Sequence, residues 1–147
     1  MNIVLSRELF DTVYPEAMPL IEVHNRQAEP DEPPVELAAG FYRQMEADGK
    51  LRIYTVRDAD SLDLKGYAVF FLTMHQHRAR FTATCDAFFP GVRGAGLALL
   101  YFIERELEKE GVERICYESR PAAPEFGELL GHLHYLPVSQ TFGKDVN

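Results

Sequence analysis

A glycine-rich turn lies in the middle of the chain, between a segment with the pattern of a strand and one with the pattern of a helix. The turn ends in Gly94, Ala95 and Gly96, followed at once by the apolar helix pattern that starts at Leu97. Small side chains let a ligand approach the backbone closely, and a helix that begins there points unpaired N–H groups and its positive dipole end outward. This arrangement predicts an anion site suited to phosphate groups. The alternative, a tight turn whose glycines serve only conformation and packing, stays open because short glycine motifs often match by chance.

Two common phosphate-binding motifs do not fit this turn. Leu99 occupies the third glycine position of a dinucleotide-binding motif, and the turn follows the third expected strand instead of the first. A P-loop needs Gly-Lys-Ser/Thr, which the sequence lacks.

Hydrophobic periodicity along the rest of the chain predicts helices and strands in alternation. The expected helices are an N-terminal one broken near Tyr14–Pro19, one that starts near Pro34 and is stopped by Asp48-Gly49, one over Leu97–Glu110 and one over Pro124–Leu133. The expected strands are Leu51–Val56, Lys65–His75, Arg78–Phe89, Val112–Glu118 and Leu136–Phe142. This order mixes antiparallel hairpins with one βαβ crossover. It predicts an α+β fold with a mixed, mostly antiparallel sheet flanked by helices, as one domain over residues 1–147.

Charge and composition limit the partners and the location. The 15 basic and 23 acidic residues give a net charge of −8, which disfavours nucleic acid as a partner. The longest apolar runs, Tyr67–Thr73 and Leu97–Ile103, are far shorter than the roughly 20 residues that span a bilayer. The N-terminus has no signal-peptide pattern, and Cys85 and Cys116 stand alone, so we expect a cytoplasmic protein with reduced thiols and no membrane partner.

The segment Arg93-Gly-Ala-Gly-Leu-Ala98 resembles the Arg/Gln-x-x-Gly-x-Gly/Ala motif of the GNAT acyl-CoA-dependent N-acetyltransferases. The flanking strand and helix and the order of elements over residues 5–145 are also similar to that family. Several shorter strings resemble phage-encoded members, in which case the protein would act in the host cytoplasm. Those strings are Pro19–His24, Gly66–Phe70, the turn with His75 and His77, and Ala83–Asp86.

The resemblance implies acetyl-CoA as cosubstrate, and no metal. Its pyrophosphate would bind the amides of Arg93–Ala98. Its pantetheine arm would pair with the backbone near Ala87–Phe89, where the strand diverges from a parallel neighbour at Val112–Glu118. The implied cofactor-binding residues are Phe88, Phe89, Val92, Arg93, Gly94, Ala95, Gly96, Leu97 and Ala98.

Amine acetylation needs an amine that has lost its proton and a route for the thiolate to leave. Asp86 lies at the strand end that should face the acetyl group, where it could deprotonate the amine or bind its ammonium; the alternative is a surface carboxylate that ends a strand. Glu22 and His24, on the N-terminal helix, are further candidates, although such a residue is more often simply a solvated helix residue. The tyrosine that many family members use as the acid for the thiolate is replaced by Leu130. Tyr117, Ser119 and Tyr135 are nearby substitutes, and the alternative is a thiolate that leaves unaided or through water.

These features predict direct transfer of an acetyl group from acetyl-CoA to a primary amine, on a small molecule or on a protein lysine or N-terminus. The alternatives are a catalytically inactive acyl-CoA-binding or host-protein interaction module of the same fold, and an unrelated α+β binding module. The sequence does not identify the acceptor. It leaves open a homodimer and leaves open whether His75 and His77 contact substrate or only lie in an exposed turn.

Overall fold

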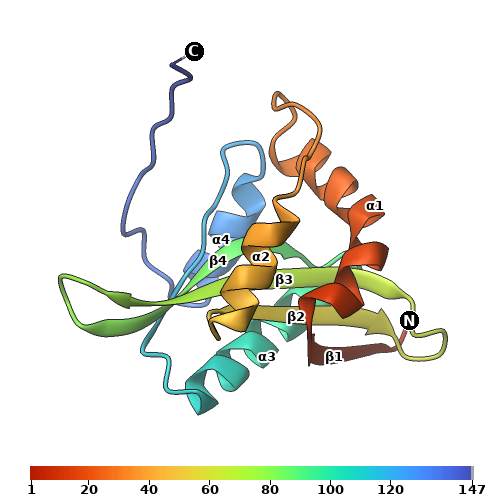
Figure 1. The fold of residues 1–147 in the computed structure, drawn as a ribbon. Helices are drawn as coiled ribbons and strands as arrows, with labels where there is room; N and C mark the ends of the chain where they lie inside the picture. Colours follow the sequence, from red (N-terminus) through yellow and green to blue (C-terminus); the bar gives the residue numbers. More distant parts are fainter. Residues whose placement is uncertain (147) are drawn as a thin grey trace.

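The computed structural model of the chain describes residues 1–146, which form one five-stranded sheet with helices on both of its faces (Figure 1). The strands are β1 (Ile3–Glu8), β2 (Leu51–Asp58), β3 (Leu64–His75), β4 (Arg80–Phe89) and β5 (Arg114–Cys116). The helices are α1 (Phe10–Ala28), α2 (Ala39–Ala47), α3 (Ala95–Lys109) and α4 (Pro124–His132). The strands lie in the order β1-β2-β3-β4-β5, and every neighbouring pair is antiparallel except β4 and β5. The predicted α+β architecture is confirmed.

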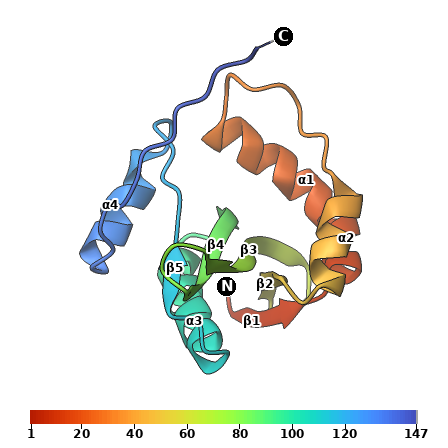
Figure 2. The ribbon, with the colours of Figure 1, turned by 60° about the vertical axis from the view of Figure 1, so that its left-hand side comes forward.

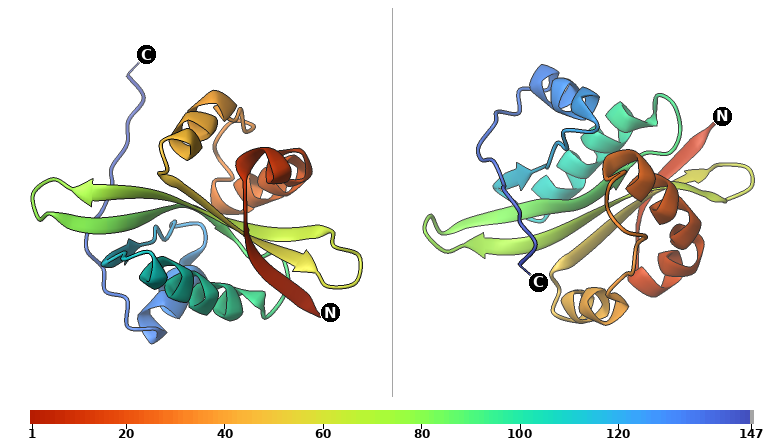
Figure 3. Two further views of the ribbon diagram at one scale, coloured as in Figure 1. Left: turned by 60° about the horizontal axis from the view of Figure 1, so that its bottom comes forward. Right: turned by 90° about the horizontal axis from the view of Figure 1, so that it is seen from above.

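Helices α1 and α2 cover one face of the sheet, and α3 and α4 cover the other (Figures 2 and 3). Each face has its own apolar cluster. Residues of the strands pack with α3 around Tyr54 and Phe70, and others pack with α1 around Phe10 and Ile53. Both sides of the sheet are therefore buried, which is why the central strand β3 is apolar at nearly every position. No helix within residues 1–146 is both long and apolar enough to cross a bilayer.

Helix α1 is continuous, and the predicted break near Tyr14–Pro19 is wrong. Pro15 and Pro19 both lie inside the helix. A proline removes one N–H, so the carbonyl four residues earlier loses its helical partner. Asp11, Pro15 and Pro19 are all exposed, so the carbonyls left without partners lie on the solvent side, where water can satisfy them. The buried positions Phe10, Val13 and Ala17 then hold the other side of the helix to the sheet.

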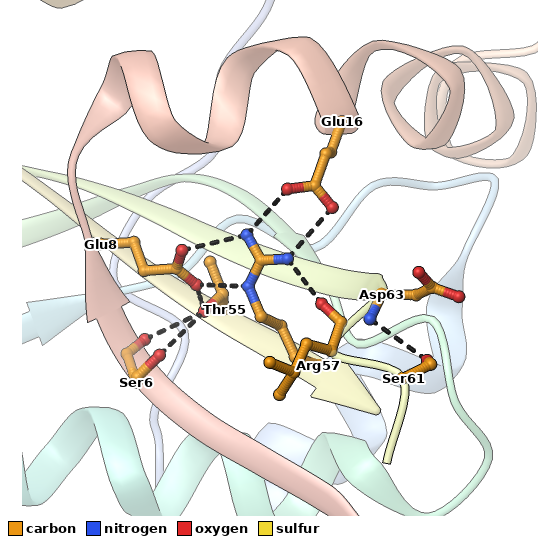
Figure 4. Close-up of polar contacts among 8 residues, drawn as sticks. Ser6, Glu8, Glu16, Thr55, Arg57, Ser61 and Asp63 are labelled. Atoms are coloured by element: carbon orange, nitrogen blue, oxygen red, sulfur yellow. Dashed lines mark hydrogen bonds and ion pairs between the residues drawn. The ribbon is translucent and has the colours of Figure 1, made fainter. Parts of the chain in front are cut away.

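Strand β1 was not expected from the sequence, and a network of polar side chains joins it to β2 and α1 (Figure 4). The Arg57 guanidinium donates to both carboxylate oxygens of Glu8, at 2.8 and 3.0 Å, and to both oxygens of Glu16, at 3.0 and 3.1 Å. Thr55 also donates to Glu8. Hydrogen bonding to Arg57 lowers the pKa of Glu8 below its ordinary value. The network fixes the start of α1 against the edge of the sheet.

The C-terminal part differs from the prediction in two ways. Strand β5 has only three residues, and the expected strand at Leu136–Phe142 has no regular secondary structure. Leu136, Val138 and Phe142 are 79%, 61% and 89% exposed, and the chain leads away from the sheet (Figure 1).

The helix expected from Pro34 begins only at Ala39, because the proline-rich connector before it has no regular secondary structure.

Candidate active site

The turn between β4 and α3 leaves the first turn of α3 open. Gly94 precedes the helix with φ of 83°, a left-handed conformation that favours glycine, and no side chain caps the helix there. A Cβ at Gly96 would meet only the Pro90 side chain, at 3.7 Å. Leu97 and Ala98 are exposed, and the Ala95 N–H donates to the Val92 carbonyl, so the N–H groups of Gly96 and Leu97 are the ones in the first helical turn without a helical partner. The helix N-terminus has the open geometry that an anion requires.

The backbone approaches itself closely just before this turn. A Cβ at Gly91, whose φ is 68°, would lie 1.7 Å from the Lys65 carbonyl oxygen, and a Cβ at Gly66 would lie 2.2 Å from that of Pro90. No residue with a Cβ fits at either position, where the two segments cross. The crossing holds the turn against the start of β3.

Strands β4 and β5 diverge beside the turn. They pair only from Thr82 to Thr84, whereas β4 continues to Phe89 while paired with β3 on its other side. A β-bulge in β4 leaves Asp86 without a partner, because Cys85 pairs with Phe70 and Ala87 with Val69. Bulges turn a side chain away from the regular alternation, and they are common near functional sites. Here the bulge lies at the point where the strands part.

One cavity of about 800 Å³ runs through this divergence, from the α1 and α2 side of the sheet to α4. Phe88 and Phe89, which are neighbours on β4, both line the cavity. Figure 2 shows α1 and α4 on either side of this end of the sheet. Four of the nine expected cofactor-binding residues line the cavity: Phe88, Phe89, Val92 and Gly96. Of the others, Ala95 is buried, and the exposed residues are Arg93, Gly94, Leu97 and Ala98.

The carboxylate of Asp86 faces this cavity and accepts a hydrogen bond of 2.6 Å from the Tyr42 hydroxyl. Asp86 is open to the cavity, but the surrounding protein removes it from bulk water, and this desolvation raises the pKa of its carboxyl. The Tyr42 hydrogen bond acts in the opposite direction and stabilises the ionised form. An aspartate with a raised pKa is better suited to take a proton from an amine than an ordinary one.

His24 also lines the cavity. It follows Glu22 by two residues on α1, so the two side chains do not share a face of the helix. Its Nδ1 lies 3.1 Å from the Tyr67 hydroxyl, and its ring stacks on Phe89 with 5.2 Å between ring centroids. Burial lowers the pKa of His24, so its ring is neutral near pH 7. Glu22 is exposed and does not line the cavity.

Tyr117 lies behind the cavity wall. Its ring packs edge-on against Phe88 and Phe126, which do line the cavity, and its buried hydroxyl has no hydrogen-bond partner within residues 1–146. Burial raises its pKa well above the usual tyrosine value. Leu130, at the position of the missing tyrosine, is buried in α4. His75 and His77 lie in the exposed hairpin between β3 and β4 and are not among the residues that line the cavity.

Sequence reasoning did not find Tyr42 or the ion pairs of Arg120. Tyr42 is 44 residues from Asp86 and has only the apolar pattern of α2 to mark it. The Arg120 guanidinium pairs with Glu29 at 2.9 Å, from the end of α1, and with Glu118 at 3.2 Å. These three residues lie at the cavity rim between α1 and the segment after β5.

The chain is similar in fold to solved acetyltransferases over nearly its whole length. Ribosomal-protein-alanine N-acetyltransferase from Brucella melitensis biovar Abortus 2308 aligns with 99% of this chain and 100% of its own, at TM-score 0.73 and 9% identity. A putative acetyl transferase from Pyrococcus furiosus aligns over 99% and 100% of the two chains, at TM-score 0.69 and 13% identity. An aminoglycoside acetyltransferase from an uncultured soil metagenomic sample, solved with sisomicin, aligns over 99% and 97%, at TM-score 0.71 and 7% identity.

By sequence, the chain matches no family model and no curated protein. Its likeness to these structures is therefore a likeness of fold. The order of elements from α1 to α4, the parallel β4–β5 pair and the open turn before α3 agree with the expectation drawn from the Arg93–Ala98 motif. The chain has the fold of the GNAT acetyltransferases.

Proposed function

We propose that the protein transfers an acetyl group from acetyl-CoA directly to a primary amine. The observation that supports this best is the continuity of one cavity from the first turn of α3, past the divergence of β4 and β5, to the carboxylate of Asp86. The N–H groups around Gly94 and Gly96 are suited to the pyrophosphate of the cosubstrate. The β4 backbone from Ala87 to Phe89 is suited to its pantetheine arm, since it is unpaired on the β5 side within the described residues.

The chemistry needs one C–N bond to form and one C–S bond to break. The amine nitrogen attacks the thioester carbonyl carbon, and CoA leaves as a thiolate. The ammonium form of the amine must first lose a proton, and Asp86 takes it directly or through a water molecule. The attack leaves the nitrogen with one proton more than the amide product holds, and this proton passes to the thiolate, whereas the proton first taken by Asp86 goes to solvent. One ammonium and one acetyl-CoA thus yield the N-acetyl product, CoA and one proton released to water.

Tyr117 is the proposed acid for the thiolate, because its ring lies next to Phe88. Its hydroxyl does not reach the cavity in this structure. Glu22 is the reserve candidate for the base. A cytoplasmic location and a phage origin remain predictions from the sequence. Apart from Leu130 at the position of the missing tyrosine, no observation within residues 1–146 favours the alternative of an inactive binding module.

We also propose a homodimer. The outer edge of β5 has no partner strand among the described residues. The tail that follows α4 exposes Leu136, Val138 and Phe142, whose spacings of two and four residues would place them on one face of an extended chain. An unpaired sheet edge and an apolar extended segment favour pairing with another chain. A second copy, whose tail would pair along β5, is the proposed partner.

The cosubstrate site is tested with Gly96→Asp. The new carboxylate would lie at the proposed pyrophosphate position and would repel it, while the space around Gly96 accepts the side chain without backbone strain. Binding of acetyl-CoA, measured by calorimetry, should fall at least about 100-fold, as expected when an unpaired like charge is placed in a binding site.

The matched control is Gly40→Asp. Gly40 is likewise the second residue of its helix, has open space around it and does not line the cavity. This variant should bind acetyl-CoA as the parent protein does. If a folded Gly96→Asp protein kept the parent affinity, the proposed function would lose its basis.

A further inference from the structure

The cavity has two parts of different character, and Asp86 lies where they meet. One part follows β4, the turn and α4, where the cosubstrate is proposed to bind. The other part extends under α1 and α2 and is here called the acceptor pocket. Its apolar lining residues are Phe10, Val13, Ala17, Ile21, Leu37, Ile53 and Val69.

The acceptor pocket is apolar because it opens into the core of the α1 and α2 face. Phe10, Val13 and Ile53 are at most 4% exposed and belong to the packed cluster behind the pocket. Ile21, Leu37 and Val69 are partly exposed and supply its accessible surface. Tyr42 connects this cluster to the carboxylate, since its ring stacks on Phe10 at 5.6 Å and its hydroxyl donates to Asp86. The pocket thus offers one anionic group at its edge and an aliphatic and aromatic surface beyond it.

The other charged side chains of the cavity lie elsewhere. Glu29 and Glu118 are at the rim, and both are already paired with Arg120. Glu125 is exposed on α4, across the cavity from the acceptor pocket. The other polar groups on this side, such as the hydroxyls of Tyr14 and Tyr67, can hydrogen-bond but carry no carboxylate. Deep in the pocket, a second ammonium would therefore lose its water without gaining a charged partner, which is costly.

We propose that the acceptor is a primary amine with a single positive charge on an apolar body, an alkylamine or arylalkylamine. Its ammonium pairs with Asp86, and its apolar body fills the acceptor pocket. This inference rests on the proposed function, because it assigns a substrate class to the same site. Polyamines and aminoglycosides carry several ammonium groups, and the pocket does not accommodate them; the sisomicin bound to a structural neighbour belongs to that protein's own site.

The first experiment compares hexylamine with 1,6-diaminohexane, which have the same length and differ by one ammonium. With saturating acetyl-CoA, CoA release gives kcat/KM for each amine. Hexylamine should be preferred by at least about tenfold, since even one methylene in an apolar pocket changes specificity by that order. Spermidine and an aminoglycoside are tested beside them. Equal or greater kcat/KM for any of these polycations would overturn the inference.

A second experiment changes the pocket at Ile21, which is partly buried on α1 and lines it. Ile21→Glu adds a carboxylate there, and Ile21→Gln adds a polar group of the same size without charge. The Glu variant should shift the ratio of kcat/KM values toward 1,6-diaminohexane by about tenfold or more relative to the Gln variant. No difference between the two variants would show that the distal end of the acceptor does not reach this pocket.

Calorimetry separates failure of this inference from failure of the proposed function. The amines are titrated into protein saturated with CoA, which needs no catalysis. If acetyl-CoA does not bind, the proposed function fails. If CoA binds but hexylamine binds no better than the diamine, the function stands and the assignment of the acceptor is wrong.

Discussion

At the scale of single residues, the protonation of Asp86 decides what the site can do. Desolvation raises its pKa, and the Tyr42 hydroxyl, 2.6 Å away, partly offsets that rise by stabilising the carboxylate. The ionised form is the one that accepts a proton, and it predominates above the pKa. We therefore expect kcat/KM for the amine to fall, as the pH is lowered, at a higher pH than an ordinary aspartate would produce.

Tyr42→Phe tests this balance. Loss of the hydrogen bond should raise the pKa of Asp86 further and move the acid limb of the pH profile of kcat/KM to higher pH. Tyr14→Phe is the control, because Tyr14 also lines the cavity but has no hydrogen bond to Asp86. The titration of the amine itself is the same for all variants. An acid limb that moves in Tyr42→Phe but not in Tyr14→Phe therefore reports the titration of Asp86. If the two variants gave the same pH profile, the assignment of the acid limb to Asp86 would be contradicted.

Asp86→Asn tests the role itself. The amide keeps the size of the side chain but accepts no proton, so kcat/KM for the amine should fall by about 100-fold or more, the lower range of acid–base contributions. Binding of acetyl-CoA, measured by calorimetry, should stay nearly unchanged. If Asp86→Asn kept the kcat/KM of the parent protein, Glu22 would become the next candidate for the base despite its exposed position.

At the scale of elements, the placement of α1 depends on charged contacts as well as on its apolar face. Arg57 and Glu8 are 14% and 17% exposed at the side chain, so their pairing takes place largely out of water. Glu16 reaches the same guanidinium from α1 but is 47% exposed. Since α1 supplies Val13, Ile21 and His24 to the cavity, this network bears on the shape of the site.

Glu8→Gln should lower the free energy of unfolding at pH 7 by about 1.5–3 kcal/mol, the range for hydrogen bonds to charged groups. Glu16→Gln should cost less than about 1 kcal/mol, because its pair is exposed. The pKa of Glu8 is lowered in the folded state, so its stabilising effect is complete above the ordinary value of 4.5 and is lost as the pH falls below it. Urea unfolding at several pH values measures this, and a penalty for Glu8→Gln that persists unchanged at low pH would argue against the ion pair.

At the scale of the whole molecule, the tail after α4 and the outer edge of β5 predict self-association. Phe142→Asp should convert the proposed dimer to a monomer, since a charge there opposes burial of an 89% exposed ring. Thr141→Asp adds the same charge on the opposite face of the extended tail, where Thr141 is exposed, and should leave the dimer intact. Light scattering coupled to gel filtration gives the mass; a parent protein that is monomeric throughout would refute the dimer.

The sequence predicted the architecture and the glycine-rich turn before α3 because both follow from short-range patterns. The apolar alternation of Leu51–Val56, the periodicity of Leu97–Glu110 and the glycines at 94 and 96 act within one or two turns of chain. Segments with weaker patterns were predicted incorrectly. Strand β1 was missed, and the prolines of α1 suggested a break that the exposed side of the helix tolerates.

The strand expected at Leu136–Phe142 shows what a local pattern cannot settle. Its alternation is typical of a strand, but a strand needs a partner, and within residues 1–146 none pairs with it. The acceptor pocket likewise depends on contacts between distant parts of the chain. Tyr42 meets Asp86 across 44 residues only because α2 lies over the bulge in β4. Residue type and spacing thus determined the elements with strong periodic patterns, from α2 to α4, and the open turn before α3. The packing of α1 and α2 on the sheet decided which side chains lie beside Asp86, since such contacts leave no periodic signal in the sequence.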